Sequence, residues 1–312
     1  MRIFRYLPVF KYFLLLPLLG ISMLAQAALA DTTPLVDGRW ALEHLGNDDV
    51  LFLDIQPAVQ YRKYHIPGAI NAPYSGWRTG KKQPPKGMLP PVEALQKKLG
   101  KLGIDAGKRV IVAATGNGAG DMAAAARVFW TLQLLGHRNV AILNGGLIAY
   151  AEANGKLEKG VNSPRAVRFK GRPNMALLAQ LEDMKKATEA KTALVDARSV
   201  AEYLGIYKGG KKERPGTIPG SRNLPFDWLT VNGSGEIHSA DNLENIFRLK
   251  GIQTKEPRER IHYCHTGNRA ALNWFVDYAL LGNQKARLYD GSTKEWSSRR
   301  DTAVKAEIEL WK

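Results

Sequence analysis

The sequence is nearly without cysteine, because Cys264 is the only one among 312 residues. A chain with one cysteine cannot form an internal disulfide, so its fold must depend on a hydrophobic core. Histidine is also scarce, and its spacing resembles no metal-binding pattern, which predicts no metal and no bound cofactor. The histidines concerned are His44, His65, His137, His238 and His262.

Acidic residues are the second shortage: 29 Asp and Glu stand against 45 Lys and Arg, a formal net charge of +16. Such an excess is typical of proteins that bind nucleic acid, an anionic surface or an anionic substrate. The lysines are not interleaved with aromatic residues along one ribbon, so we expect no nucleic-acid binding and favour an anionic small molecule. They are scattered, as at Lys81, Lys82, Lys86, Lys97, Lys98, Lys101 and Lys108.

Long apolar runs are confined to the N-terminus. Residues 1–11 are basic, residues 12–24 are almost wholly apolar, and small residues precede Asp31. This layout predicts a signal peptide over 1–30, export to the periplasm or medium, and no stable membrane insertion after cleavage behind Ala30. The alternative is an uncleaved anchor, because the uncharged stretch is close to bilayer-spanning length. In an exported protein, an unpaired cysteine indicates a reactive thiol or an intermolecular link.

The rest of the sequence consists of one pattern that occurs twice. The apolar run Val50–Asp54 matches 193–198, and Ile-Pro-Gly occurs at 66–68 and again at 218–220. Helical periodicity follows over 123–135 and over 270–281 in the two copies. Because strands alternate with helices, each copy is predicted to be an α/β domain with a mostly parallel sheet flanked by helices.

The two copies set the predicted domain boundaries. The first domain is expected over 31–154 and the second over 174–312. Residues 155–173 are rich in Gly, Lys and Pro and lack an apolar period, so they are predicted to be a linker. The second copy also carries a longer basic loop over 204–216, which is either a solvated excursion or the border of a site.

The cysteine lies where this pattern predicts a loop between a strand and a helix. The strand is expected over 260–263, Gly267 permits a tight turn, and Arg269 stands at the start of the helix. Backbone N–H groups and the helix N-terminus favour an anion at such a loop, and the arginine adds a positive charge, so a reactive thiolate is favoured at Cys264. The alternative is a small buried apolar side chain.

Overlaying the two copies assigns the chemistry to the second. The shared Thr-Gly-Asn letters place Ala113 at the position of Cys264 and Gly118 at that of Arg269. The first copy is therefore expected to keep the loop and to lack the thiol.

With these motifs, the mature chain resembles the tandem-domain rhodaneses, sulfurtransferases of the thiosulfate or 3-mercaptopyruvate type. The resemblance implies a catalytically silent first domain and a catalytic second domain in which Cys264 carries sulfur as a persulfide. It also implies a substrate-binding role for the arginine of Asp-Ala-Arg and for the loop residues. The binding residues expected are Arg198, Arg269, His265, Thr266, Gly267 and Asn268.

The expected reaction moves sulfane sulfur from thiosulfate to cyanide or a thiol, with a protein acceptor as a further possibility. The positively charged loop favours thiosulfate over 3-mercaptopyruvate, which stays an alternative, as does a non-enzymatic persulfide carrier or partner-docking module. Related phosphatases have five residues between cysteine and arginine, and four separate Cys264 from Arg269, which disfavours phosphate. Thr217 stands where the first copy has His65, so no role is expected there.

Overall fold

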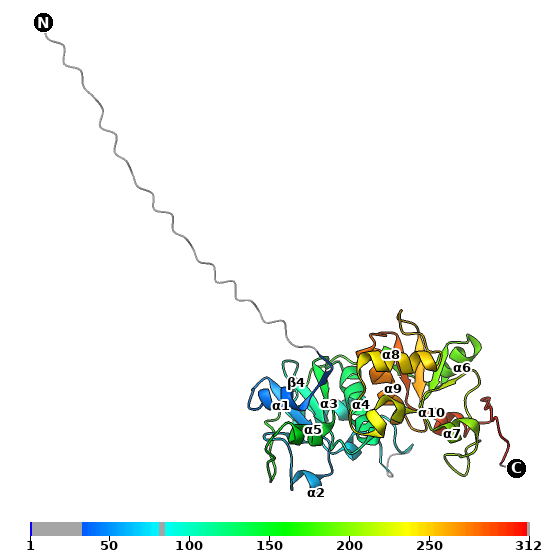
Figure 1. Ribbon diagram of the computed structural model, residues 1–312, viewed down its shortest axis with the longest axis horizontal. Helices are drawn as coiled ribbons and strands as arrows, with labels where there is room; N and C mark the ends of the chain where they lie inside the picture. The colour runs from blue at the N-terminus through cyan, green and yellow to red at the C-terminus, as the bar shows by residue number, and fades with distance from the viewer. Residues whose placement is uncertain (2–32, 81–84, 311–312) are drawn as a thin grey trace. The chain divides into compact units, whose positions relative to one another are not determined.

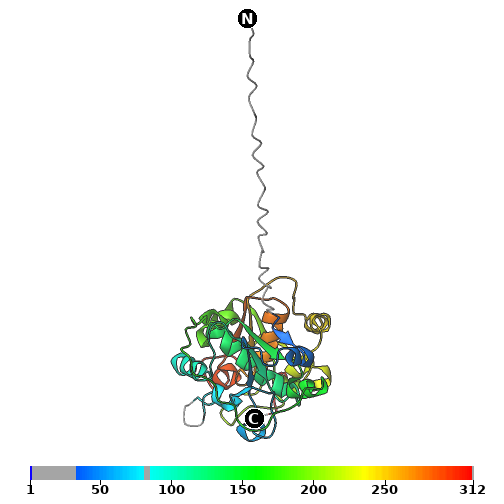
Figure 2. The ribbon, with the colours of Figure 1, turned by 90° about the vertical axis from the view of Figure 1, so that its left-hand side faces the viewer.

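The computed structural model describes residues 1, 33–80 and 85–310. Residues 33–80 and 85–310 belong to one compact unit that contains two five-stranded sheets. Helices lie on both sides of these sheets (Figure 1, Figure 2). The predicted signal peptide over 1–30 lies outside the described residues, apart from Met1.

The first sheet has the strand order β1-β5-β4-β2-β3, and all of its neighbouring strands are parallel. Its central strand is buried along its whole length, because Val110, Ile111 and Val112 face helices on both sides. The strands are β1 (Leu35–Val36), β2 (Val50–Asp54), β3 (Ile70–Asn71), β4 (Arg109–Ala113) and β5 (Val140–Leu143). The helices are α1 (Gly38–Glu43), α2 (Ala58–Tyr61), α3 (Val92–Lys101), α4 (Ala119–Leu134) and α5 (Gly146–Glu152).

The second sheet repeats this topology in the order β6-β10-β9-β7-β8, again with parallel neighbours. The prediction of two mostly parallel sheets flanked by helices is therefore confirmed. The strands are β6 (Leu178–Ala179), β7 (Ala193–Asp196), β8 (Arg222–Asn223), β9 (Arg260–Tyr263) and β10 (Ala286–Tyr289). The helices are α6 (Leu181–Glu189), α7 (Val200–Leu204), α8 (Ala240–Leu249), α9 (Arg269–Phe275) and α10 (Ser292–Trp296).

The helix predicted over 270–281 divides into two parts. The α-helix α9 ends at Phe275 and continues as a π-helical turn over Val276–Leu280. A π turn inserts one extra residue into the helix, and here it holds Asp277 between Arg260 and His262 of β9. The segment therefore departs from the regular α-helix that apolar periodicity predicts. The departure places a buried acid beside two basic partners.

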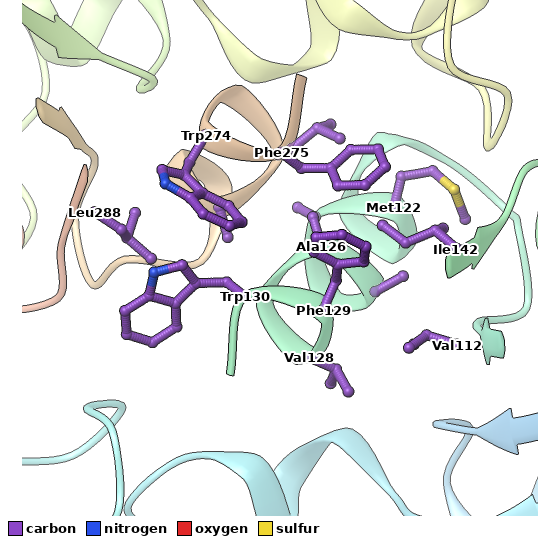
Figure 3. Packing of buried hydrophobic residues seen from close by; sticks show 14 of the residues in the cluster. Val112, Met122, Ala126, Val128, Phe129, Trp130, Ile142, Trp274, Phe275 and Leu288 are labelled. Atoms are coloured by element: carbon purple, nitrogen blue, oxygen red, sulfur yellow. The ribbon is translucent and has the colours of Figure 1, made fainter. Parts of the chain in front are cut away.

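The two halves share one core through α4 and α9. Phe129 of α4 packs edge-on against Phe275 of α9, with ring centroids 4.8 Å apart, and Trp274 lies beside them (Figure 3). Residues 155–173 contain no helix, and their amides bond to the first half, as from Val167 to Gly100. The predicted domain boundaries stay predictions.

Candidate functional site

Cys264 follows β9 directly and lies in the loop that leads to α9, as the sequence predicts. This is the carboxyl end of a parallel strand, where open α/β sheets bind their ligands. The side chain is buried, at 1% exposure, and it is a free thiol. The thiol is therefore enclosed by the residues around it.

Strand pairing corrects the overlay of the two copies by one residue. Asp54 pairs with Ala113, whereas Asp196 pairs with Tyr263, so the residue that follows β4 is the counterpart of the cysteine. The α5 amide of Leu147 donates to the Ala114 carbonyl at 2.9 Å, as Thr293 donates to Cys264 at 3.0 Å. Ala114 therefore stands at the position of Cys264.

The same shift applies to the arginine. Ala119 is the first residue of α4 and Arg269 is the first residue of α9, so Ala119 is the counterpart of Arg269. The prediction that Gly118 takes this place is wrong by one residue. The conclusion that the first copy lacks both the thiol and the arginine is unchanged.

Four amides of the loop are free to bind an anion. Cys264 and Gly267 donate to the hydroxyl of Ser292, at 3.1 and 3.0 Å. Within the described part of the chain, no acceptor takes the remaining N–H groups of the loop, and a thiolate or persulfide would be stabilised by such groups. These groups belong to His265, Thr266, Asn268 and Arg269.

Ser292 is held in a strained conformation to make these contacts. Its φ is +52°, in the left-handed region that side chains rarely adopt, and it is fully buried. Its hydroxyl also donates to the Tyr289 carbonyl at 2.8 Å. Gly146 occupies the corresponding turn in the first half, so the hydroxyl is particular to the thiol-bearing half.

Arg269 forms an ion pair across the loop rather than standing free. It donates to both carboxylate oxygens of Glu202 in α7, at 2.6 and 2.9 Å. Burial would raise the pKa of Glu202, but the hydrogen bonds and charge of Arg269 outweigh it and bring that pKa to about 2. Burial lowers the pKa of Arg269, whereas Glu202 and nearby Cys264 raise it, and the net direction is upward. Arg269 therefore lies within electrostatic range of the Cys264 thiol.

Arg198 is more deeply engaged than its predicted binding role requires. It is 4% exposed and donates to both oxygens of Asp196, at 2.9 and 2.6 Å, and to the Gly216 carbonyl at 2.8 Å. Arg198 is thus paired with Asp196, whereas the other nearby acid, Glu202, is paired with Arg269. The structure shows a tightly paired residue behind the loop, and a contact between Arg198 and substrate stays a prediction.

His265 faces the basic loop at 204–216. Its Nε2 lies 2.9 Å from a carboxylate oxygen of Glu213, which the second copy carries in its insertion. The insertion therefore borders the site, which decides between the two interpretations of that loop. A cavity of about 940 Å³ lies beside it, lined by Gly210, Lys211, Lys212, Lys294, Leu181, Leu89 and neighbouring residues.

The first half supplies three further contacts to the loop. Arg78 donates to the Thr266 carbonyl at 2.6 Å, Arg127 of α4 donates to the Gly267 carbonyl at 3.1 Å, and the Tyr74 hydroxyl bonds to the Asn268 side chain. Burial raises the pKa of Tyr74, and nearby Cys264 contributes in the same direction. The sequence carries no local signal for these residues, because they lie at least 130 positions from the loop.

The loop of the first half is filled by its own side chain. The carboxylate of Asp121 accepts from the amides of Gly116 and Asn117, at 3.1 and 3.0 Å. Counting from the helix start, Ala271 stands at the corresponding place in the second half. The first loop is thus both without a thiol and already occupied by an anion.

Metal binding has no candidate in the described ranges, 33–80 and 85–310, where no three His, Cys, Asp or Glu gather in a way that could hold an ion. In the same ranges, no helix combines the length and apolarity needed to cross a bilayer.

Comparison with known proteins agrees with this architecture. A model of the rhodanese-like domain matches residues 37–153 and 177–299. A Synechococcus elongatus protein named "Putative thiosulfate sulfurtransferase" is 30% identical over 287 residues, covering 88% of this chain and 86% of that protein. "Sulfur carrier protein TtuD" of Thermus thermophilus is 31% identical over 276 residues, covering 85% and 93%.

A solved structure agrees with both the fold and the repeat. SseA from Escherichia coli, described with the 3-mercaptopyruvate sulfotransferases, has a TM-score of 0.72 and 28% identity, covering 83% of this chain and 98% of that chain. The chain belongs to the rhodanese family, with two rhodanese-like domains in tandem.

Proposed function

We propose that this protein is a sulfurtransferase that carries sulfane sulfur as a Cys264 persulfide. The observation that supports this best is that four of the five amides after the cysteine have no hydrogen-bond acceptor among the described residues. Fixed N–H dipoles in a water-poor site stabilise a thiolate and a persulfide without reorganising.

The proposed reaction has two balanced steps. The Cys264 thiolate attacks the outer sulfur of thiosulfate, the sulfur–sulfur bond of the donor breaks, and sulfite leaves with the bonding electron pair. Cyanide or a thiolate then attacks the outer sulfur of the persulfide, and the Cys264 thiolate leaves as the new carbon–sulfur or sulfur–sulfur bond forms. No external oxidant or reductant is consumed.

Thiosulfate is the donor we propose, with 3-mercaptopyruvate as the alternative. Arg269 is within electrostatic range of the thiol and the chain carries a formal charge of +16, and both favour a dianion. A relative named for thiosulfate and a solved structure described for 3-mercaptopyruvate support the two donors about equally, so the preference depends on charge. Glu202 already neutralises much of the charge of Arg269, so both donors are measured.

The acceptor we propose is cyanide in the assay and an anionic thiol in the cell. The cavity beside the insertion has a volume of about 940 Å³, far more than cyanide requires. Two of its carboxylates have a cationic partner, Glu182 with Lys185 and Asp290 with Arg127, whereas Glu213 contacts His265 and Glu295 accepts from the Tyr289 hydroxyl. In the described chain no carboxylate pairs with the cavity lysines, so three ammonium groups are available to a bound anion. These are Lys211, Lys212 and Lys294.

A protein acceptor is the second candidate. It is favoured by the relative named as a sulfur carrier protein. In that case the chain would pass its persulfide to a partner and would form little thiocyanate. We also propose that the protein is exported and that its signal peptide is cleaved after Ala30. The mass of the protein isolated from the periplasm or medium tests this cleavage.

The deciding experiment measures thiocyanate formed from thiosulfate and cyanide by the purified protein and by Cys264→Ser. We expect turnover by the wild type and a loss of at least about 10³-fold in the variant, since the covalent step is removed. 3-Mercaptopyruvate is assayed in parallel to settle the donor. An inert wild type that is isolated with a persulfide would favour the carrier function. Undiminished turnover by Cys264→Ser would refute the mechanism.

A further inference from the structure

The loop carbonyls from Cys264 to Gly267 are all bonded away from the loop. Cys264 and His265 accept from the first amides of α10, donated by Thr293 at 3.0 Å and Lys294 at 3.1 Å. Among the described residues of their own domain, Thr266 and Gly267 have no such partner. Their acceptors are filled by the first domain, from Arg78 and Arg127.

A held carbonyl also sets the direction of the next amide. The peptide unit is planar and trans, so the N–H of a residue points opposite to the C=O of the residue before it. Arg78 on the Thr266 carbonyl therefore orients the Gly267 amide, which reaches Ser292 at 3.0 Å. Arg127 on the Gly267 carbonyl orients the Asn268 amide, one of the four that remain free.

Both arginine side chains are fixed in position by contacts within the first domain and with Asp290. Arg127 is fully buried, stacks over the Trp130 ring at 4.5 Å and pairs with Asp290. Arg78 is half-buried, and its Nε donates to the Gly87 carbonyl at 2.9 Å. Gly267 has φ +69°, a conformation open to glycine, so its peptide can turn unless its carbonyl is held.

We propose that Arg78 and Arg127, both in the domain without the thiol, are positioning residues for the sulfur-carrying loop. They hold the two carbonyls that the second domain leaves free, and so they orient the Gly267 amide, which donates to Ser292, and the Asn268 amide, one of the four left for the anionic sulfur. The first domain then has a function in the reaction although it has lost its own thiol. This inference rests on the proposed role of Cys264 as the reacting thiol.

The test compares Arg78→Met and Arg127→Met with Arg109→Met. Arg109 is a matched control, because it is also buried in the first domain, lies over a Trp ring at 5.0 Å and donates to a backbone carbonyl, that of Thr33. Arg78→Met keeps the experiment decisive if Arg127→Met does not fold, since Arg78 is only half-buried. Melting temperature establishes which variants are folded.

Two readouts follow in the folded variants. The rate of Cys264 alkylation by iodoacetamide at pH 7 should fall about tenfold or more in Arg78→Met and Arg127→Met, because the loop peptides are no longer held in the orientation that stabilises the thiolate. The kcat with thiosulfate should fall by a similar factor, and KM should change less than about threefold, since the amides act on the transferred sulfur rather than on donor binding. Arg127→Lys should recover part of the loss, because one nitrogen replaces the forked donors.

The outcomes separate this inference from the proposed function. Alkylation rates and kcat in Arg78→Met and Arg127→Met equal to those of Arg109→Met would overturn it, whatever the wild type does. Slower alkylation in both variants, found together with a wild type that transfers no sulfur, would uphold the positioning role and refute the sulfurtransferase function. A higher KM with unchanged kcat and alkylation rate would place the arginines in donor binding and would also overturn the inference.

Discussion

At the scale of single residues, the basic side chains of the site are each paired with an acidic one. Arg269 is paired with Glu202, Arg198 with Asp196 and His265 with Glu213. The neutral amides of the loop are thus the donors left for an anion. The positive charge that the sequence places at Arg269 is thus held by Glu202.

The pair of Glu202 and Arg269 makes stability depend on pH. The pKa of Glu202 falls from 4.5 to about 2 on folding, so its stabilising contribution is complete above pH 4.5 and is lost as the pH falls toward 2. We expect Glu202→Gln to lower the free energy of unfolding by roughly 2 kcal/mol at pH 7, with a difference that shrinks below pH 4.

Urea unfolding between pH 3 and pH 7 measures this dependence. Glu244→Gln is the control, because Glu244 is exposed on α8. A Glu202→Gln difference that is the same at every pH would show that the ion pair is not its source.

At the scale of elements, the two loops at the carboxyl ends of β4 and β9 differ in what fills them. In the first domain the Asp121 carboxylate takes two loop amides, and in the second the amides are left for a ligand. Restoring the thiol alone should therefore not restore reactivity. The loops diverge by one residue, since glycine comes two positions after Ala114 and three after Cys264.

This contrast is tested in a Cys264→Ser background. We expect Ala114→Cys to be alkylated at least about tenfold more slowly than Cys264 in the wild type, because Asp121 already fills the loop and repels a second anion. Adding Asp121→Ala should increase the rate, and the iodoacetamide reaction at pH 7 measures it. Equal rates with and without Asp121 would contradict this account of the silent loop.

At the scale of the whole described unit, the two domains are joined by a continuous core. Phe129, Trp274 and Phe275 pack together across α4 and α9, and Arg127 extends from the same helix to the loop. Residues 33–80 and 85–310 form one compact unit, which is expected to unfold as one.

Phe129→Ala tests this shared core. It should destabilise the protein by about 3–5 kcal/mol through the cavity it leaves, and the single unfolding transition should persist. Calorimetry of the variant measures both quantities, with exposed Val59→Ala as a control that should change little. Two separated transitions in the wild type would show that the domains are stabilised independently.

Much of the fold was open to prediction from the sequence alone. Buried runs such as Val50–Asp54 and the alternation with helical periods are local patterns, and local patterns determine element type. The repeat determined that the architecture occurs twice, and the lone Cys264 before a glycine and a helix start predicted where the reactive thiol lies. The overlay was off by one residue because shared Thr-Gly-Asn letters outweighed the strand register, which depends on pairing partners.

Only the tertiary structure decided which groups complete the site. Arg78 and Arg127 are separated by at least 140 positions from the residues whose carbonyls they hold, and Ser292 by 28 from the cysteine, so no spacing rule connects them. Ion-pair partners such as Asp196 for Arg198 depend on side-chain geometry, which periodicity does not contain. The sequence determined the thiol and its loop, and the packing of the first domain against the second decided how that loop is held.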